Sequence, residues 1–286
     1  MKSFILACFA TISISILTAA GQTSDPSALQ RMAATERAFA ASALELGVRD
    51  AFLTYFADDA VSLKPGADGA HASVVRAKDE LRQLPQPKLP LASQLLWEPF
   101  TGHISSDQSL GWLTGGFVNM TTVTKDIAGK GAYFSVWKHQ PDGTWRVWLD
   151  EGISLPSVWQ DASPFRAAPE PDSGSAGSAS ETIEAAERAV SSGGAAWQAR
   201  LAQDVRLHRD GVMPRVGREA VVDWASAWQS VRYTVIKTER AASDDLAVTV
   251  GGYDATPAQH GTWVRVWKRA PNGNWRIVFE TSKAAR

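Results

Sequence analysis

One stretch of the chain occurs twice, and this repeat limits the possible folds more than any other feature. Residues 131–150 read GAYFSVWKHQPDGTWRVWLD, and residues 261–280 read GTWVRVWKRAPNGNWRIVFE. The two copies align without a gap, and each alternates apolar and polar residues around a Pro-Asp-Gly or Pro-Asn-Gly tripeptide. Such a tripeptide favours a type I turn that ends in a left-handed glycine. Each copy is therefore predicted to be a β-hairpin.

The similarity continues upstream of the hairpins. SLGWLTGGF at 109–117 resembles DLAVTVGGY at 245–253, and DAFLTYFADDA at 50–60 resembles AAWQARLAQDV at 195–205. The chain is therefore read as a tandem duplication, and its 286 residues suit two cores better than one. We expect one domain over 25–156 and a second over 180–282. The Pro-, Gly-, Ser- and Ala-rich stretch at 157–179 is expected to be a flexible linker.

Each copy has helical periodicity first and alternation afterwards. In copy one Asp25 and Pro26 can begin a helix, and Leu29, Met32 and Phe39 continue it at three-and-four spacing. Alternating stretches follow near 94–105, 109–124, 131–139 and 144–151. This order predicts an α+β fold, in which N-terminal helices pack on a curved antiparallel sheet.

The N-terminus has the pattern of a secretory signal peptide. Lys2 precedes an apolar run, and small residues follow at 18–21. The alternative, a membrane anchor, needs about 20 uninterrupted apolar residues. We therefore expect cleavage after residue 21, export to the periplasm and no membrane contact afterwards. The single cysteine, Cys8, would leave with this peptide, so the exported chain would have no thiol. A net charge of −1 argues against a nucleic-acid partner.

Three motifs together resemble a known superfamily. FADDAV at 56–61, LGWLTGG at 110–116 and the VWK-turn-GxWR hairpin resemble nuclear transport factor two-like proteins, which share a cone-shaped fold with ketosteroid isomerase and SnoaL-like cyclases. The similarity is to an uncharacterised branch of small domains. It implies two cone-shaped domains and a small-molecule ligand. TWVRVW in copy two also resembles a strand of the calcium/calmodulin-dependent kinase association domain, whose arginine points into the cone. That arginine is Arg265 here, and copy one has Ser135 instead.

The isomerase chemistry of the superfamily does not transfer to this chain. The position that matches the proton-shuttling aspartate holds Lys64 in copy one and Arg209 in copy two. The position that matches the oxyanion tyrosine falls near Phe39 and near Val190, and neither side chain can donate a hydrogen bond. Steroid isomerisation is therefore not expected.

A candidate ligand-binding face lies on the first strand of each hairpin. Alternation places Trp263, Arg265 and Trp267 on one face in copy two, and Tyr133 and Trp137 on the matching face in copy one. An arginine between indoles can hold a carboxylate while the rings cover an apolar ligand. This arrangement suggests a small, partly apolar and anionic ligand. Alternatively, the tryptophans fill the core and Arg265 reaches solvent at the rim.

Acidic residues on the second hairpin strand are candidates for catalysis. Simple alternation places Trp148 and Asp150 on one face, and Val278 and Glu280 on the matching face of copy two. Trp148 and Glu280 thereby join the predicted ligand-binding residues. An acid that faces an apolar cone has a raised pKa and can act as a general acid or base, so Asp150 and Glu151 are the catalytic candidates. The alternative is an exposed strand end or an ion pair with arginine.

Two further glutamates stand out, and the histidines do not. Glu36 and Glu187 each interrupt the apolar stripe of a first helix, where they could cap backbone or pair with a buried arginine. The five histidines lack metal-ligand spacing, and no Gly-rich phosphate loop follows a strand. We therefore predict no metal site and no cofactor.

These observations leave three hypotheses for function. The first is an exported protein that binds a small ligand without an assignable reaction. The second is a lyase, isomerase or hydrolase that uses an acid in the first cone. The third is a structural pseudo-dimer in which copy two has no working pocket. A pocket with an inward acid favours the second, a pocket without one the first, and filled cones the third. Copy one is expected to pack on copy two, or the chain to dimerise through its sheets.

Overall fold

The computed structural model describes residues 26–66, 72–161, 164–225, 231–256 and 259–285. The predicted signal peptide lies outside these ranges. Within them, no helix has the length and apolar character that a membrane crossing requires.

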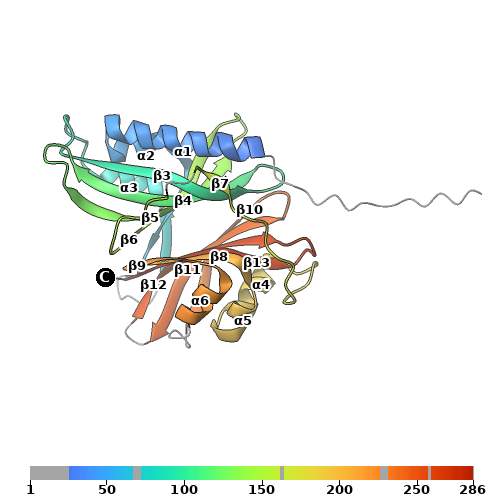
Figure 1. Ribbon diagram of the computed structural model, residues 1–286. Coiled ribbons are helices and arrows are strands. Elements are labelled where there is room, and N and C mark those ends of the chain that lie inside the picture. Colours follow the sequence, from blue (N-terminus) through green and yellow to red (C-terminus); the bar gives the residue numbers. More distant parts are fainter. Residues whose placement is uncertain (1–25, 67–71, 162–163, 226–230, 257–258, 286) are drawn as a thin grey trace, which may run out of the picture.

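Copy one begins with helices and continues with strands (Figure 1). Its elements are α1 (Pro26–Leu46), α2 (Val48–Tyr55), β1 (Phe56–Lys64), β2 (Ser73–Arg76), α3 (Ala77–Gln83), β3 (Ser93–Ile104), β4 (Leu110–Thr121), β5 (Ile127–His139) and β6 (Trp145–Ser154). A short strand, β7 (Arg166–Ala167), follows it. The apolar residues Leu29, Met32 and Phe39 of α1 join Trp97 and Trp137 of the sheet in one buried core, as the helical periodicity predicted.

Copy two repeats the same order of elements in fewer residues. These are α4 (Ile183–Val190), α5 (Gly194–Gln198), β8 (Leu201–Arg209), β9 (Val212–Val216), α6 (Arg218–Ala225), β10 (Arg232–Arg240), β11 (Leu246–Thr256), β12 (Gln259–Arg269) and β13 (Trp275–Ala284). Both repeated stretches form the predicted hairpins, β5–β6 and β12–β13. Their turn glycines, Gly143 and Gly273, have φ angles of 80° and 81° and so need the left-handed region.

The two sheets have the same topology. In the described part of the chain, the strand order is β2-β1-β6-β5-β4-β3-β7 in one sheet and β10-β11-β12-β13-β8-β9 in the other. Read from the opposite edge, the second order matches the first strand for strand, apart from the added β7. The fold class is α+β, as predicted. The sheets are mixed rather than purely antiparallel, because β1 pairs in parallel with β6, β8 with β13 and β7 with β3.

A β-bulge interrupts the second strand of each hairpin. On β5 and β6 the pairing passes from Val136 with Leu149 to Trp137 with Val147, so Trp148 has no partner of its own. The same shift occurs between β12 and β13 and leaves Val278 unpaired. A bulge reverses the alternation of faces on one side of it. Trp148 and Val278 therefore do not lie on the faces that simple alternation predicted.

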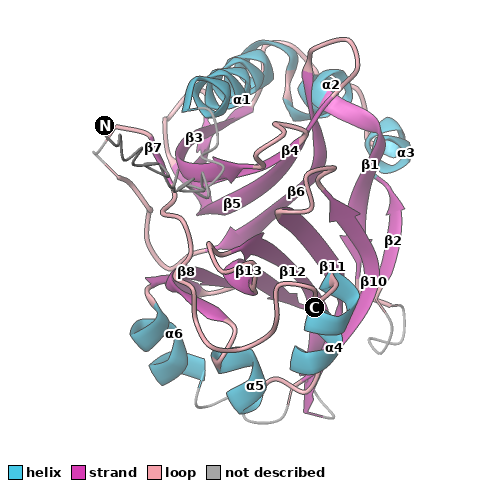
Figure 2. Ribbon diagram, turned by 90° about the vertical axis from the view of Figure 1, so that its right-hand side faces the viewer, coloured by secondary structure: helices cyan, strands magenta, loops and turns pink. Residues whose placement is uncertain are grey.

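The two sheets face each other, and the helices lie on the outer sides of the molecule (Figures 1 and 2). Apolar side chains from both sheets form one shared core between the copies. At its centre the rings of Phe134 and Phe279 stack, with their centroids 4.2 Å apart, and Trp112 lies 5.5 Å from Phe279. Copy one therefore packs on copy two, which is one of the two arrangements expected from the sequence.

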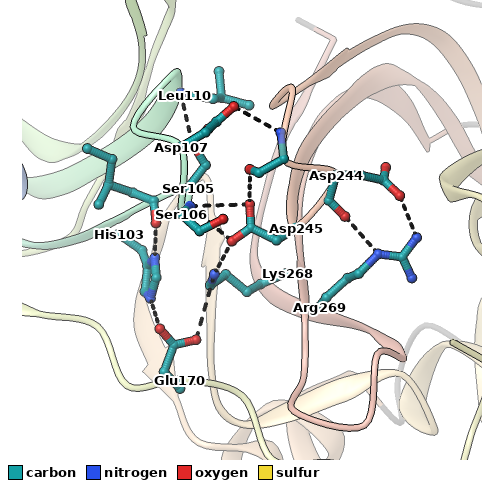
Figure 3. A network of polar contacts seen from close by, with 12 residues as sticks. His103, Ser105, Ser106, Asp107, Leu110, Glu170, Asp244, Asp245, Lys268 and Arg269 are labelled. Carbon is teal, nitrogen blue, oxygen red and sulfur yellow. Dashed lines mark hydrogen bonds and ion pairs between the residues drawn. The ribbon is translucent and has the colours of Figure 1, made fainter. Parts of the chain in front are cut away.

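A polar cluster joins the β3–β4 turn to the β10–β11 turn at the edge of this interface (Figure 3). The carboxylate of Asp107 accepts a hydrogen bond from the backbone N–H of Ser243 at 2.9 Å. In return, Asp245 accepts one from the backbone N–H of Ser106 at 3.1 Å. Asp245 also binds the buried ammonium of Lys268 at 2.9 Å. In the equivalent contact, Ser109 Oγ accepts a hydrogen bond from the backbone N–H of Ala242 at 3.3 Å. Because Ser109 matches Asp245 and Ala242 matches Ser106 in the repeat, this contact is reciprocal, as in the two-fold interface of a homodimer.

Parts of the predicted linker contact both copies. Arg166 and Ala167 pair in parallel with β3 of copy one. Glu170 accepts a hydrogen bond from His103 of copy one and lies 3.7 Å from Lys268 of copy two. Asp172 binds Arg218 of copy two at 2.7 Å. The domain boundaries and the flexibility of this stretch stay predictions.

Candidate functional site: the interiors of the two cones

The interior of copy two is organised around a buried arginine. Arg265 is 0% exposed, and its Nη1 donates to Glu187 at 2.6 Å while its Nε donates to Glu280 at 2.7 Å. The sequence left two partners open for this guanidinium, an internal acid or a bound anion. The structure shows internal acids, one from α4 and one from β13. Burial alone would lower the pKa of Arg265, but the two carboxylates outweigh it and raise that pKa.

Other groups complete the neutralisation of the two acids. Glu280 also accepts from Arg209 and, at 2.8 Å, from Trp197 Nε1. Burial raises the pKa of Glu280, but the charges of Arg265 and Arg209 outweigh burial and lower it from 4.5 to about 2. Glu187 accepts further hydrogen bonds from Thr249 Oγ1 and Trp267 Nε1. Glu280 is therefore held as an anion.

Aromatic rings enclose the same guanidinium. Its central carbon lies 4.6 Å from the ring centroid of Trp263, 4.7 Å from that of Tyr233 and 5.8 Å from that of Trp267. A cation over an aromatic face gains stabilisation that grows when water is excluded. Arg265 is thus held by two charges and three rings, while its buried Nη2 donates to no group that the structure describes.

The interior of copy one has the corresponding glutamate but a serine in place of the arginine. Glu36 of α1 is 0% exposed and accepts hydrogen bonds from Trp97 Nε1 at 2.7 Å, Ser135 Oγ at 2.6 Å and Trp137 Nε1 at 2.9 Å. All three donors are neutral. Burial therefore raises the pKa of Glu36, and the hydrogen bonds only partly oppose it.

Copy one contains a cavity of about 120 Å³. Aromatic and aliphatic side chains form most of its wall, together with one carboxylic acid, Asp150 of β6. The lining residues are Phe52, Leu95, Trp97, Phe117, Tyr133, Asp150 and Gly152. An apolar cavity of roughly 150 Å³ is large enough to hold benzene. The cavity of copy one therefore suits the ring or short alkyl group of a small molecule.

Two polar groups of the cavity wall have no internal partner in the described residues. Tyr133 is 5% exposed, and its hydroxyl makes no hydrogen bond to any group that the structure describes. Burial, followed by repulsion from Glu36 and Glu151, raises the pKa of Asp150 well above its usual value. Burial likewise raises the pKa of Tyr133. An uncharged acid and a phenol can each donate one hydrogen bond to a bound molecule.

The predicted catalytic pair lies on opposite faces of β6. Asp150 pairs with Ser135 on the cone face, whereas Glu151 pairs with Phe134, whose ring lies in the core between the copies. Burial, partly opposed by Lys283, raises the pKa of Glu151 to about 7. Neighbouring residues of a strand point to opposite faces, so the two acids cannot serve one cone together.

Trp148 is also placed differently from the prediction. The bulge turns it into the core between the copies, where it packs with Trp112 and Phe134 rather than with the described residues of the cavity wall. The other predicted ligand-binding residues do face the cone interiors. Tyr133 lines the cavity, Trp137 and Trp267 donate to the two helix glutamates, and Trp263, Arg265 and Glu280 form the centre of copy two. Their role in binding a ligand stays a prediction.

The sequence reasoning missed most of the cavity wall. Leu95 and Trp97 alternate on β3, and Phe117 of β4 pairs with Trp97, so these three side chains share a face. That alternation was available from LLWEPF at 95–100, but the pairing of β3 with β4 was not. Phe52 comes from α2, and its place over the sheet depends on tertiary packing.

Comparisons with known proteins give likenesses to solved structures. No family model and no curated protein matches the chain. A putative ketosteroid isomerase from Parabacteroides distasonis is 17% identical, over 36% of this chain and 86% of that one, with a TM-score of 0.31. A putative calcium/calmodulin-dependent protein kinase type II association domain from Thiobacillus denitrificans is 21% identical, over 37% and 96%, with a TM-score of 0.31. Nuclear transport factor 2 from Cryptosporidium parvum is 12% identical, over 36% and 88%, with a TM-score of 0.30. These structures carry the names of the proteins that the sequence motifs resemble. The likeness concerns the fold only.

Proposed function

We propose that copy one binds a small, partly apolar molecule in its cavity and that copy two is a structural partner without a working site. The observation that carries this proposal is the contrast between the two interiors. Asp150 lines a cavity of about 120 Å³ in copy one, whereas its equivalent in copy two, Glu280, is paired with Arg265 and Arg209. A mostly apolar cavity with a few convergent polar groups is the usual form of a small-molecule site.

The charge around the cavity does not support the anionic ligand suggested by the sequence. That suggestion depended on Arg265, which is already bound to Glu187 and Glu280. In copy one the groups nearest the cavity are acids, because Asp150 lines it and Glu36 lies close enough to repel its charge. An anion placed there would add to this repulsion.

A cavity-filling variant tests the binding site. A Cβ atom built on Gly152 would lie 3.5 Å from Phe117, so a leucine can enter the cavity from this position without a backbone clash. We expect small neutral aromatic probes such as benzyl alcohol to raise the melting temperature of the native chain but not that of Gly152→Leu. Gly129→Leu, on the same sheet and away from the cavity wall, is the matched control. If the probes raised the melting temperatures of all three proteins equally, they would bind outside this cavity. Mass spectrometry of molecules retained on purification would then identify the natural ligand.

A second function, general acid–base catalysis, is favoured by one observation. Asp150 has a raised pKa and lines the cavity together with the unpartnered hydroxyl of Tyr133. An acid with a pKa near the working pH is suited to proton transfer. Asp150 rather than Glu151 is proposed for this role, because Glu151 lies on the other face of β6. If the retained molecule is turned over, Asp150→Asn should abolish turnover and leave its binding measurable.

We also propose that the protein is exported to the periplasm. The support comes from residues 1–21, whose basic, apolar and small-residue segments follow the order of a signal peptide. Mass spectrometry of the chain isolated from its native cells tests this, because cleavage should remove residues 1–21. An intact N-terminus would contradict export by this route.

A further inference from the structure

The two cones differ at one position that decides their charge. Ser135 on β5 pairs with Asp150 on β6, and Arg265 on β12 pairs with Glu280 on β13. These pairs occupy equivalent places in the repeated hairpins. The guanidinium of Arg265 therefore lies against Glu280 in copy two. In copy one the short, neutral side chain of Ser135 lies at the equivalent place beside Asp150.

The rings around Arg265 also have equivalents in the wall of the cavity. Tyr233 pairs with Tyr253, and Trp97 pairs with Phe117 at the matching places of copy one. Trp263 pairs with Gly251, just as Tyr133 pairs with Gly115. The two rings nearest the guanidinium of copy two thus correspond to Trp97 and Tyr133, and both line the cavity of copy one.

Copy one lacks the cations that neutralise copy two. The equivalent of Arg209 is Lys64, which forms its ion pair with Glu80 of α3 and not with Asp150. The groups that act on Asp150 are Glu36 of α1 and Glu151 of its own strand, and both are acidic. Arg37, the next residue of α1, is paired with Glu98 of β3 at 2.6 Å. The described surroundings of the cavity are therefore acidic and aromatic, with no cation paired to Asp150.

We propose that the cavity of copy one binds a small organic cation, an ammonium or guanidinium group carried on an apolar body. The cationic group lies between the rings of Trp97 and Tyr133 and against Asp150, as Arg265 lies among its own acids and rings in copy two. The charge of the bound cation favours the carboxylate form of Asp150 over the uncharged form. The hydroxyl of Tyr133 accepts one of the remaining N–H groups. This inference rests on the proposed function, since it names the ligand class of the same cavity.

Three probes of one shape test the charge of the ligand. Isothermal titration calorimetry of the native chain near pH 8 compares benzylammonium, benzyl alcohol and benzoate. We expect benzylammonium to bind about tenfold or more tightly than benzyl alcohol, because it gains an ion pair and a cation–π contact, and benzoate to bind least. Asp150→Asn should remove the advantage of benzylammonium. Glu151→Gln, which changes the neighbouring acid on the other face of β6, should keep it.

A second variant copies the arrangement of copy two into copy one. Ser135→Arg should supply an internal guanidinium to Glu36 and Asp150 and thereby abolish binding of benzylammonium. Circular dichroism and a cooperative melting transition establish that each variant is folded. A folded Ser135→Arg protein that still binds benzylammonium with native affinity would overturn the inference.

The probes also separate this inference from the proposed function. If benzyl alcohol binds as tightly as benzylammonium or more tightly, the cation inference is wrong while small-molecule binding stands. If benzoate binds best, the cation inference is wrong and the ligand is an anion. If none of the three binds the native chain at millimolar concentration, both proposals are wrong.

Discussion

Removal of the Arg265 guanidinium should be among the most destabilising single changes in this protein. The side chains of Arg265 and Glu280 are 0% exposed and that of Glu187 is 3% exposed, so solvent cannot screen the charges left behind. Arg265→Ala breaks two charge-assisted hydrogen bonds, each worth roughly 1.5–3 kcal/mol. Glu280 retains Arg209, whereas the partners left to Glu187 among the described residues are the neutral donors Thr249 and Trp267. We therefore expect a loss of about 3–5 kcal/mol, the range for breaking a buried ion pair.

The assay is urea unfolding at a series of pH values, with Arg240→Ala as the control. Arg240 is half exposed and pairs with Asp244 of the β10–β11 turn, so its loss should cost about 0–1 kcal/mol. The double variant Arg265→Ala with Glu187→Gln should recover part of the loss, because the acid that lacks any other cation is then neutral.

The pH dependence follows from the lowered pKa of Glu280. The pKa of Glu280 is about 2 in the folded protein against 4.5 for an ordinary glutamate. Its contribution to the free energy of unfolding is therefore fully present above pH 4.5 and is lost as the pH falls toward 2. Arg265→Ala removes much of this contribution. The difference in unfolding free energy between native and variant chains should therefore be largest above pH 5 and should narrow as the pH falls. A loss no larger than that of Arg240→Ala, or one independent of pH, would refute the reasoning.

Three further outcomes are expected. Burial raises the pKa values of Asp150 and Glu151, so ionisation of these acids destabilises the fold as pH rises. Asp150→Asn and Glu151→Gln should therefore each raise the melting temperature at pH 8 and have little effect at pH 4. A lower melting temperature at pH 8 would contradict this. Phe279→Ala should cost about 3–5 kcal/mol in urea unfolding, because its fully buried ring stacks on Phe134 between the copies, and a cost near zero would mean that the two sheets do not share a core. Limited proteolysis should cut the chain first within 161–180. The two fragments should still elute together on size exclusion, because the shared core holds them together. A first cut inside either sheet would argue against a flexible linker.

The repeat allowed the architecture to be predicted from the sequence. The arrangement of side chains inside the cones could be predicted only in part, because it depends on local features such as a β-bulge. The hairpins, their left-handed turn glycines and the helix of Leu29, Met32 and Phe39 all follow from short-range patterns, and all are present. The place of Trp148 does not follow, because a β-bulge has no signal in the letters VWLD and reverses the face of one residue. Strand periodicity gives two faces but cannot say where one extra residue is inserted.

The shared core between the copies was only partly visible in the sequence. In AYFSVW and TWVRVW the residues on the second face, such as Phe134 and Val266, are as apolar as those on the first. A strand that is apolar on both faces indicates a sheet covered on both sides. The sequence therefore suggested a partner for each sheet. It could not show that the partner of each is the other copy, because that depends on the length and path of the intervening chain.

The joining of both copies in one polypeptide has a consequence for how such a protein can evolve. In a homodimer built on the reciprocal contacts of Ser109 and Asp245, one gene would encode both halves, so any substitution would alter both interiors at once. An arginine that filled one cone would then fill the other. Tandem duplication separates the two halves genetically, so Arg265 could arise in one while Ser135 stayed in the other. One half is thereby free to specialise as a scaffold, and selection for a ligand acts on the other half alone.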